Sequence, residues 1–133
     1  MTIYENVGEK STRELIEGLH ANTTVLPEFQ RNFVWSPSRT IELLASIANE
    51  YPAGNILRVR DGHFIETRPV DSAPPVGHGH RPTFLILDGQ QRLTSLYHAF
   101  FGRGEFRFYL DLRKARLDTD FTKEDTITFQ DAS

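Results

Sequence analysis

The sequence predicts an α+β fold with one small mixed β-sheet and three main helices. Apolar residues recur at helical spacing in three separate segments. Short apolar or alternating runs, typical of strands, lie between and after those segments. The predicted order is helix, extended segment, helix, hairpin, strand, helix, strand, which is an α+β order.

The first two helices are predicted from their start signals. Residues 11–20 form one helix, in which Ser11 and Glu14 make a capping box before a short apolar stripe. The second helix begins at Ser36-Pro37, with Ser as N-cap and Pro at the first helical position. It is expected to end near Tyr51, because the proline and glycine that follow cannot continue it.

Between these helices, residues 25–27 are extended. Residues 55–60 alternate between apolar and polar, so we expect a strand, an Asp61-Gly62 turn and a return strand over 63–68. Residues 69–82, rich in proline, are predicted to be a long exposed loop.

In the second half of the chain, residues 84–87 form a continuous apolar run, as expected of a strand buried on both faces. A third helix follows the Asp88-Gly89 turn and stops at Gly102. The remaining predictions are a strand over 106–110, an edge strand over 115–118 and a last strand over 126–129.

Length and composition set limits on the class of protein. The 133 residues suit a single domain, and 38% hydrophobic content suffices for a packed core. The chain has no cysteine, no signal-peptide pattern and no apolar run of about eighteen residues, so we expect a cytoplasmic protein without a membrane segment. The net charge of −3 argues against a stand-alone DNA-binding domain. The last residues follow a predicted strand without a polar tail, so we expect a piece of a longer protein.

The leading candidate site is the strand-to-helix turn at residues 85–94. A helix N-terminus carries unpaired N–H groups and a partial positive charge that attract anions, and Gly89 lets the backbone approach a ligand. Arg92 adds a planar charged fork suited to phosphate, while Gln90 and Gln91 offer hydrogen-bond donors. Asp88 is expected to hold a metal-bound water or to accept a proton.

A ligand-free interpretation of this turn stands beside the functional one. Asp88 followed three residues later by Gln91 is also a capping box, which requires no ligand. That interpretation leaves unexplained why two amides and an arginine follow the turn directly.

The second candidate segment is residues 26–36, where Phe29, Phe33 and Trp35 alternate around a polar centre. One interpretation is an aromatic cluster that fixes the start of the second helix to the core. The other brings Gln30 and Arg31 into the same cleft as Arg92, where two arginines would form a polyanion site.

Together the two segments resemble the N-terminal domain family of GmrSD-type restriction systems that depend on DNA modification. That family pairs a P-x-F-Q-R-x-F-x-W segment with a later D-G-Q-Q-R-L-T-S-L segment. The matching residues here are Pro27, Phe29, Gln30, Arg31, Phe33 and Trp35, followed by Asp88 through Leu96. The resemblance covers roughly residues 11–112, and it implies a fold similar to ParB and sulfiredoxin, which bind nucleotide at a strand-to-helix turn.

The resemblance implies an NTP-hydrolysing domain that uses NTP with Mg²⁺ and licenses DNA cleavage. The resemblance places the family's active segment on residues 88–92, with Gln30 and Arg31 as its companion motif. Within that segment we expect Asp88, Gln91 and Arg92 to be catalytic. The phosphate-binding residues are Gly89, Gln90, Arg92, Thr94, Gln30 and Arg31, with any Mg²⁺ near Asp88. Cleavage belongs to an HNH-type C-terminal nuclease domain in the family, so no nuclease activity is expected of these residues, and DNA is expected as a partner of the whole protein.

Two other functions remain open from the residues. The basic cleft could sense modified DNA without turnover, or both motifs could be caps and core in a purely structural or interaction domain. His78 and His80 lack a third metal ligand in view, and Arg113, Lys114 and Arg116 are typical of a solvated face. No Walker A motif or dinucleotide fingerprint is present.

Overall fold

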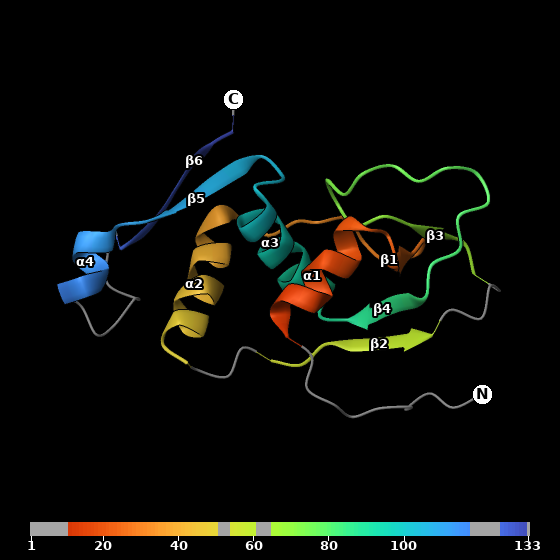
Figure 1. The fold of residues 1–133 in the computed structure, drawn as a ribbon, viewed down its shortest axis with the longest axis horizontal. Helices are drawn as coiled ribbons and strands as arrows, with labels where there is room; N and C mark the ends of the chain where they lie inside the picture. The colour runs from red at the N-terminus through yellow and green to blue at the C-terminus, as the bar shows by residue number, and fades with distance from the viewer. Residues whose placement is uncertain (1–10, 51–53, 61–64, 118–125, 133) are drawn as a thin grey trace.

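The computed structural model of this chain describes residues 11–50, 54–60, 65–117 and 126–132. The helices are α1 (Thr12–His20), α2 (Pro37–Ala48), α3 (Gln90–Phe101) and α4 (Leu112–Leu117). The strands are β1 (Thr24–Pro27), β2 (Leu57–Arg60), β3 (Thr67–Arg68), β4 (Phe84–Asp88), β5 (Phe106–Leu110) and β6 (Ile127–Asp131). The predicted α+β class is confirmed (Figure 1).

The main sheet is mixed, as predicted, with the strand order β2-β4-β1-β3. Its two central strands are parallel, with Val25 opposite Leu85. Both outer strands run antiparallel to their neighbours. Leu85 and Ile86, which point to opposite faces of β4, are both buried, as the apolar run predicts.

The predicted hairpin between residues 55–60 and 63–68 is wrong. β2 pairs with β4, and β3 pairs with β1 on the far side of the sheet. The Asp61-Gly62 turn lies outside the described residues. The parallel β1–β4 pair leaves one edge open on each strand, and these edges take up β2 and β3 separately.

Helix starts follow the local sequence signals. The Ser11 hydroxyl accepts a hydrogen bond from the Glu14 N–H at 3.1 Å, and the Ser36 hydroxyl accepts one from the Arg39 N–H at 3.3 Å. These bonds satisfy N–H groups that have no partner inside the helix, so both predicted N-caps are confirmed. α2 ends at Ala48, and the predicted end near Tyr51 lies outside the described residues.

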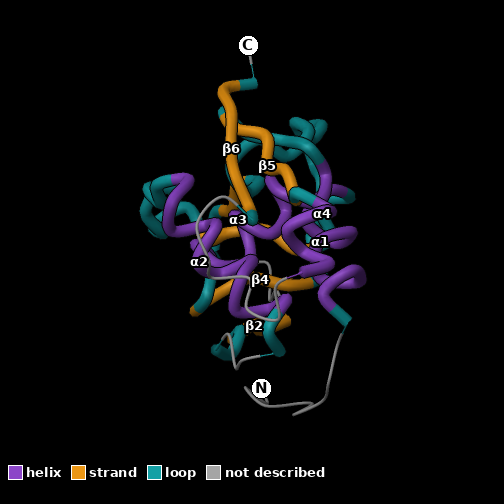
Figure 2. The backbone as a smooth tube through the Cα atoms, turned by 90° about the vertical axis from the view of Figure 1, so that its left-hand side faces the viewer, coloured by secondary structure: helices purple, strands orange, loops and turns teal. Residues whose placement is uncertain are grey.

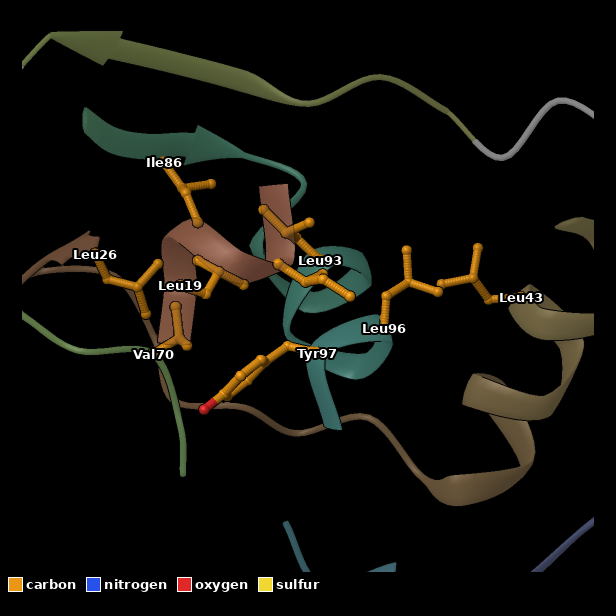
Figure 3. Packing of buried hydrophobic residues seen from close by; sticks show 9 residues of the cluster. Leu19, Leu26, Leu43, Val70, Ile86, Leu93, Leu96 and Tyr97 are labelled. Carbon is orange, nitrogen blue, oxygen red and sulfur yellow. The ribbon is translucent and has the colours of Figure 1, made fainter. Parts of the chain in front are cut away.

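The core lies between the sheet and helices α1 and α3, and it receives Leu43 from α2 (Figure 3). Ile86 of β4 points toward Leu19 of α1 and Leu93 of α3, and all three are at most 1% exposed. The predicted apolar face of the third helix is confirmed at Leu93, Leu96 and Tyr97. It differs at its end, where Phe100 is 59% exposed and Phe101 packs against the core instead.

The long segment 69–82 contains no helix or strand, but it is fastened to the body of the domain rather than fully exposed. Val70 is 2% exposed and belongs to the core cluster. The Asn22 side-chain amide donates to the Pro74 carbonyl at 2.8 Å, and the His80 ring nitrogen Nε2 lies 2.6 Å from the Asn22 carbonyl oxygen. The prediction of a loop is confirmed and most of its residues are exposed, but the buried Val70 and these two polar contacts attach it to the domain.

The C-terminal strands form a second, smaller sheet, so the prediction of one sheet is wrong. β5 and β6 make their own two-stranded antiparallel ribbon, so the last predicted strand is confirmed. The predicted edge strand over 115–118 is wrong, because α4 occupies residues 112–117. The Asp111 carboxylate accepts from the N–H groups of Arg113 and Lys114, which favours a helical start over a strand.

Two views show how these parts are stacked. The β5–β6 ribbon lies at the top, β2 and β4 lie at the bottom, and the three longer helices lie between them (Figures 1 and 2). Within the described residues, no helix has the length and apolar character that crossing a membrane requires.

Candidate functional site

The site is centred on the sharp turn where β4 becomes α3. Gly89 is the N-cap of α3 and has φ 87°, a left-handed conformation that side chains disfavour. A Cβ at this position would lie 2.6 Å from Ile56 Cδ1 and 3.0 Å from the Asn55 carbonyl oxygen. Both the conformation and the packing therefore require glycine at the start of α3.

The alternative capping box at this turn is absent. The structure gives α3 no side-chain cap, and the Asp88 carboxylate accepts from the Gly89 N–H at 2.9 Å instead. The Gln91 amide points to another segment of the chain. The first N–H groups of α3 consequently remain without a side-chain acceptor among the described residues.

The two glutamines after the turn hold the loop that carries the other motif. Gln90 is 6% exposed and donates through Nε2 to the Arg31 carbonyl at 2.7 Å. Gln91 is 7% exposed, donates through Nε2 to the Asn32 carbonyl at 2.9 Å, and accepts the Val34 N–H at 2.9 Å through Oε1. These bonds join segments that lie 57 to 59 residues apart in the sequence.

The same loop is also fastened from the sheet. The Gln30 amide donates to the Leu87 carbonyl of β4 at 3.3 Å. Arg68 of β3 donates to the Asn32 side-chain oxygen at 2.8 Å and to the Gln30 carbonyl. Hydrogen bonds with β3, β4 and α3 thus hold residues 30–34. They fix the position of the Arg31 backbone, while the Arg31 side chain is exposed.

Both motifs line one pocket of about 280 Å³. Three cationic side chains, Arg31, Arg39 and Arg92, line it together with a single carboxylate, Asp88. The structure therefore brings Gln30 and Arg31 into the same pocket as Arg92, as the functional interpretation of the two motifs requires. The other lining residues are Trp35, Leu87, Gly89, Gln90 and Gln91.

The arginines of this pocket, called here the arginine pocket, are held in different ways. Arg92 donates through Nη2 to the Asn55 carbonyl, which uses one of its five N–H groups. The guanidinium carbon of Arg39 lies 4.9 Å from the centroid of the Trp35 ring, a cation–π contact. A positively charged pocket beside a helix N-terminus suits an anion with several oxygens.

Sequence reasoning misplaced one residue of this site and missed two. Thr94, expected to bind phosphate, lies on the buried side of α3, is 0% exposed and does not line the arginine pocket. Arg39, which was not singled out from the sequence, and Trp35, which was assigned to the aromatic cluster, both line the pocket. The two residues are four positions apart at a helix start, a spacing that brings side chains together on one side of a helix, and this spacing could have identified them.

The donor set limits what cation the arginine pocket can hold. Asp88 is its single acidic lining residue, and the described residues contain no group of three or more His, Cys, Asp or Glu side chains placed for a metal. Mg²⁺ is commonly held by one or two carboxylates together with substrate phosphates. Asp88 would supply one carboxylate to a Mg²⁺ ion that enters together with a phosphate chain.

The other predicted candidates lie elsewhere. The His80 ring contacts the Asn22 carbonyl oxygen, as described above, and His78 is exposed in the same loop. His98 is 6% exposed, and its ring nitrogen Nε2 lies 3.0 Å from the Asp71 carbonyl oxygen.

The sequence matches a family model and one curated protein. Residues 12–132 match the family model described as "GmrSD restriction endonuclease, N-terminal domain". The chain is also 31% identical to "Uncharacterized protein MJ0686" of Methanocaldococcus jannaschii, over 79% of this chain. It spans only 20% of that protein's length, and no solved structure matches the chain. Because the family model covers both motifs and nearly all of the described fold, the chain belongs to the family of GmrSD restriction endonuclease N-terminal domains.

Proposed function

We propose that this domain binds an NTP with Mg²⁺ and hydrolyses it, as the regulatory domain of a modification-dependent restriction or phage-defence protein. The observation that carries the proposal is the convergence of three arginines and the N-terminus of α3 on one pocket. Membership in a restriction endonuclease family supports the defence context.

Phosphate binding follows from the chemistry of the arginine pocket. The triphosphate carries several negative charges, which Arg31, Arg39 and Arg92 neutralise in part. The first N–H groups of α3 donate to phosphate oxygens, and Gly89 leaves room for that approach. Gln90 lines the same pocket, although its Nε2 is already bonded to the Arg31 carbonyl.

Hydrolysis requires an activated water and a stabilised leaving group. Bound Mg²⁺ would supply charge neutralisation for the phosphate oxygens. The water oxygen bonds to the γ-phosphorus while the bond from that phosphorus to the bridging oxygen breaks. The bridging electron pair leaves with the NDP, the water proton passes to the Asp88 carboxylate, and inorganic phosphate is released.

The role of Gln91 changes in this proposal. Its carbonyl oxygen and its amide nitrogen are both engaged with the backbone of the 32–34 segment. We therefore assign Gln91 to positioning that segment rather than to contact with the reacting atoms. Asp88 and Arg92 keep the catalytic roles, and Thr94 supports the helix from inside the core.

A second candidate function is a DNA-sensing module without turnover. The observation that favours it is Phe29, a large apolar side chain that is 71% exposed one residue before Gln30 and two before Arg31. Exposed aromatic rings beside cations stack on nucleobases. The net charge of −3 weighs against this candidate.

The test is phosphate release from each of the four NTPs with Mg²⁺, using this chain and its Asp88→Asn and Arg92→Ala variants. The matched controls are Asp131→Asn and Arg13→Ala, which change exposed residues outside the arginine pocket. The proposal expects turnover that both site variants abolish and both controls retain. It fails if the chain neither binds nor hydrolyses any NTP, and DNA binding with a steep salt dependence would then favour the second candidate.

A further inference from the structure

A second pocket of about 270 Å³ adjoins the arginine pocket, and Trp35 lines both. Its walls come from the loop after residue 32, the start of α2, residue 98 of α3 and strand β5. The lining residues are Phe33, Val34, Trp35, Pro37, Thr40, Asp71, His98, Glu105, Phe106 and Phe108. Aromatic rings dominate this set, so it is called here the aromatic pocket.

The aromatic pocket suits a flat ring. Phe33, Trp35, Phe106 and Phe108 supply four aromatic side chains, and such rings stack on nucleobases. Drug-sized ligands occupy pockets of about 300–1,000 Å³, so this smaller volume suits a single ring system. Phe33 is itself held by the His98 ring, whose centroid lies 4.7 Å away in an edge-to-face contact.

The acidic groups of this pocket are hydrogen-bond acceptors, and they lie beside the Thr40 hydroxyl and the His98 ring, which can also donate. Asp71 and Glu105 bring two carboxylates, and the pocket has no lysine or arginine in its lining. The His98 ring nitrogen Nε2 lies 3.1 Å from one carboxylate oxygen of Asp71, which orients that side chain, and the side chain stays 51% exposed. An accessible, oriented carboxylate accepts hydrogen bonds from ring N–H or amino groups.

The two pockets thus have opposite charge. The arginine pocket has three cations and one carboxylate, whereas the aromatic pocket has two carboxylates and no fixed cation. Phosphates are repelled from the aromatic pocket and attracted to its neighbour. Charge therefore favours one orientation for a molecule that is anionic at one end and carries a flat hydrogen-bond donor at the other.

We infer that the aromatic pocket is the nucleobase subsite of the nucleotide whose phosphates occupy the arginine pocket. The inference rests on the proposed function. Phe33, Trp35, Phe106 and Phe108 stack on the base, while Asp71 and Glu105 accept its N–H or amino hydrogens. The carboxylates of the aromatic pocket therefore determine which base is preferred.

The test is calorimetric binding of the four NTPs and of inorganic tripolyphosphate, which has no base, with Mg²⁺ throughout. We expect at least one NTP to bind about tenfold tighter than tripolyphosphate, or about 1.4 kcal/mol. Glu105→Gln, a change at an exposed residue, is expected to reduce the difference between the NTPs and to leave tripolyphosphate binding unchanged. Glu42→Gln, also at an exposed residue, is the control that changes neither.

Two further variants separate the two subsites. Phe106→Leu is expected to weaken every NTP but not tripolyphosphate, whereas Arg92→Ala weakens all of them. If tripolyphosphate and the four NTPs bind equally well, the base subsite is overturned and the phosphate site stands. If neither NTP nor tripolyphosphate binds, both the inference and the proposed function are overturned.

Discussion

The side-chain amide of Gln91 is bonded to the backbone of Val34, whose N–H donates to Gln91 Oε1 at 2.9 Å. The same amide donates to the Asn32 carbonyl at 2.9 Å, so one side chain satisfies two backbone groups of a loop that has no regular structure. The contact ties the start of α3 to the segment that carries Arg31. The shape of the arginine pocket therefore depends on Gln91.

Gln91→Ala is expected to destabilise the domain by about 1–3 kcal/mol, because it removes both bonds from a buried side chain. Urea unfolding measures the effect. Gln130→Ala, at an exposed position of β6, is the control and is expected to change stability by less than about 0.5 kcal/mol. Equal stability of the two variants would contradict a clamping role.

Gly89→Ala is expected to cost about 2–4 kcal/mol, because a Cβ both disfavours φ 87° and meets Ile56 Cδ1 at 2.6 Å. Thermal or urea unfolding detects the loss. Gly77→Ala provides the matched change, since a Cβ there has no heavy atom within 4 Å. A Gly89→Ala variant as stable as Gly77→Ala would show that the turn relaxes freely.

Arg39→Ala is expected to weaken tripolyphosphate binding about fivefold, which corresponds to about 1 kcal/mol for one charge at the rim of the arginine pocket. The binding constant is measured at low and at high salt, because screening reduces the effect at high salt. Arg13→Ala removes an exposed arginine of α1 that pairs with Glu17, and it should leave binding unchanged. The same loss in both variants would indicate only a general charge effect.

Val70→Ala is expected to destabilise the domain by about 2 kcal/mol, because the side chain is 2% exposed and packs in the core cluster. Val76→Ala, in the same segment but 39% exposed, should cost less than about 0.5 kcal/mol. Chemical unfolding compares them. If Val70→Ala were as mild as Val76→Ala, the segment would not be anchored at this point.

Asp111 gives a pH dependence whose sign follows from its contacts. The Lys114 N–H, together with the Arg113 N–H, lowers the pKa of the Asp111 carboxyl below its usual value of 3.8. A lowered folded-state pKa means that the stabilising contribution is present above the unfolded value and is lost as the pH falls through the folded value. Carboxyl NMR titration should show a midpoint below 3.8.

An Asp111→Asn variant provides the comparison for that titration. The amide signals of Arg113 and Lys114 should follow the Asp111 midpoint in the original chain and stop doing so in the variant. Persistent titration of both amides in Asp111→Asn would assign the effect to another group.

The first three helices and most strands were predictable from the sequence because their signals are local. A serine N-cap, a proline at the first helical position and a 3.6-residue apolar repeat all act within one or two turns of helix. The structure confirms the helix starts at Ser11 and Ser36 and the apolar stripe of α3. The two candidate motifs could also be identified from the sequence. One places polar residues at a strand-to-helix turn, and the other places them between aromatic residues.

The sequence did not determine which strands pair or what the glutamines hold. An alternating run followed by a DG turn favours a hairpin. In the structure β2 pairs with β4 and β3 pairs with β1, because the parallel β1–β4 pair has an open edge on each side. The second candidate segment and the start of α3 are joined by bonds across 57 to 59 residues, and no local pattern encodes such a contact. Tertiary packing alone decided that Gln91 clamps a loop, that Thr94 is buried and that Arg39 joins the arginine pocket, because each depends on which surfaces meet once the core has formed.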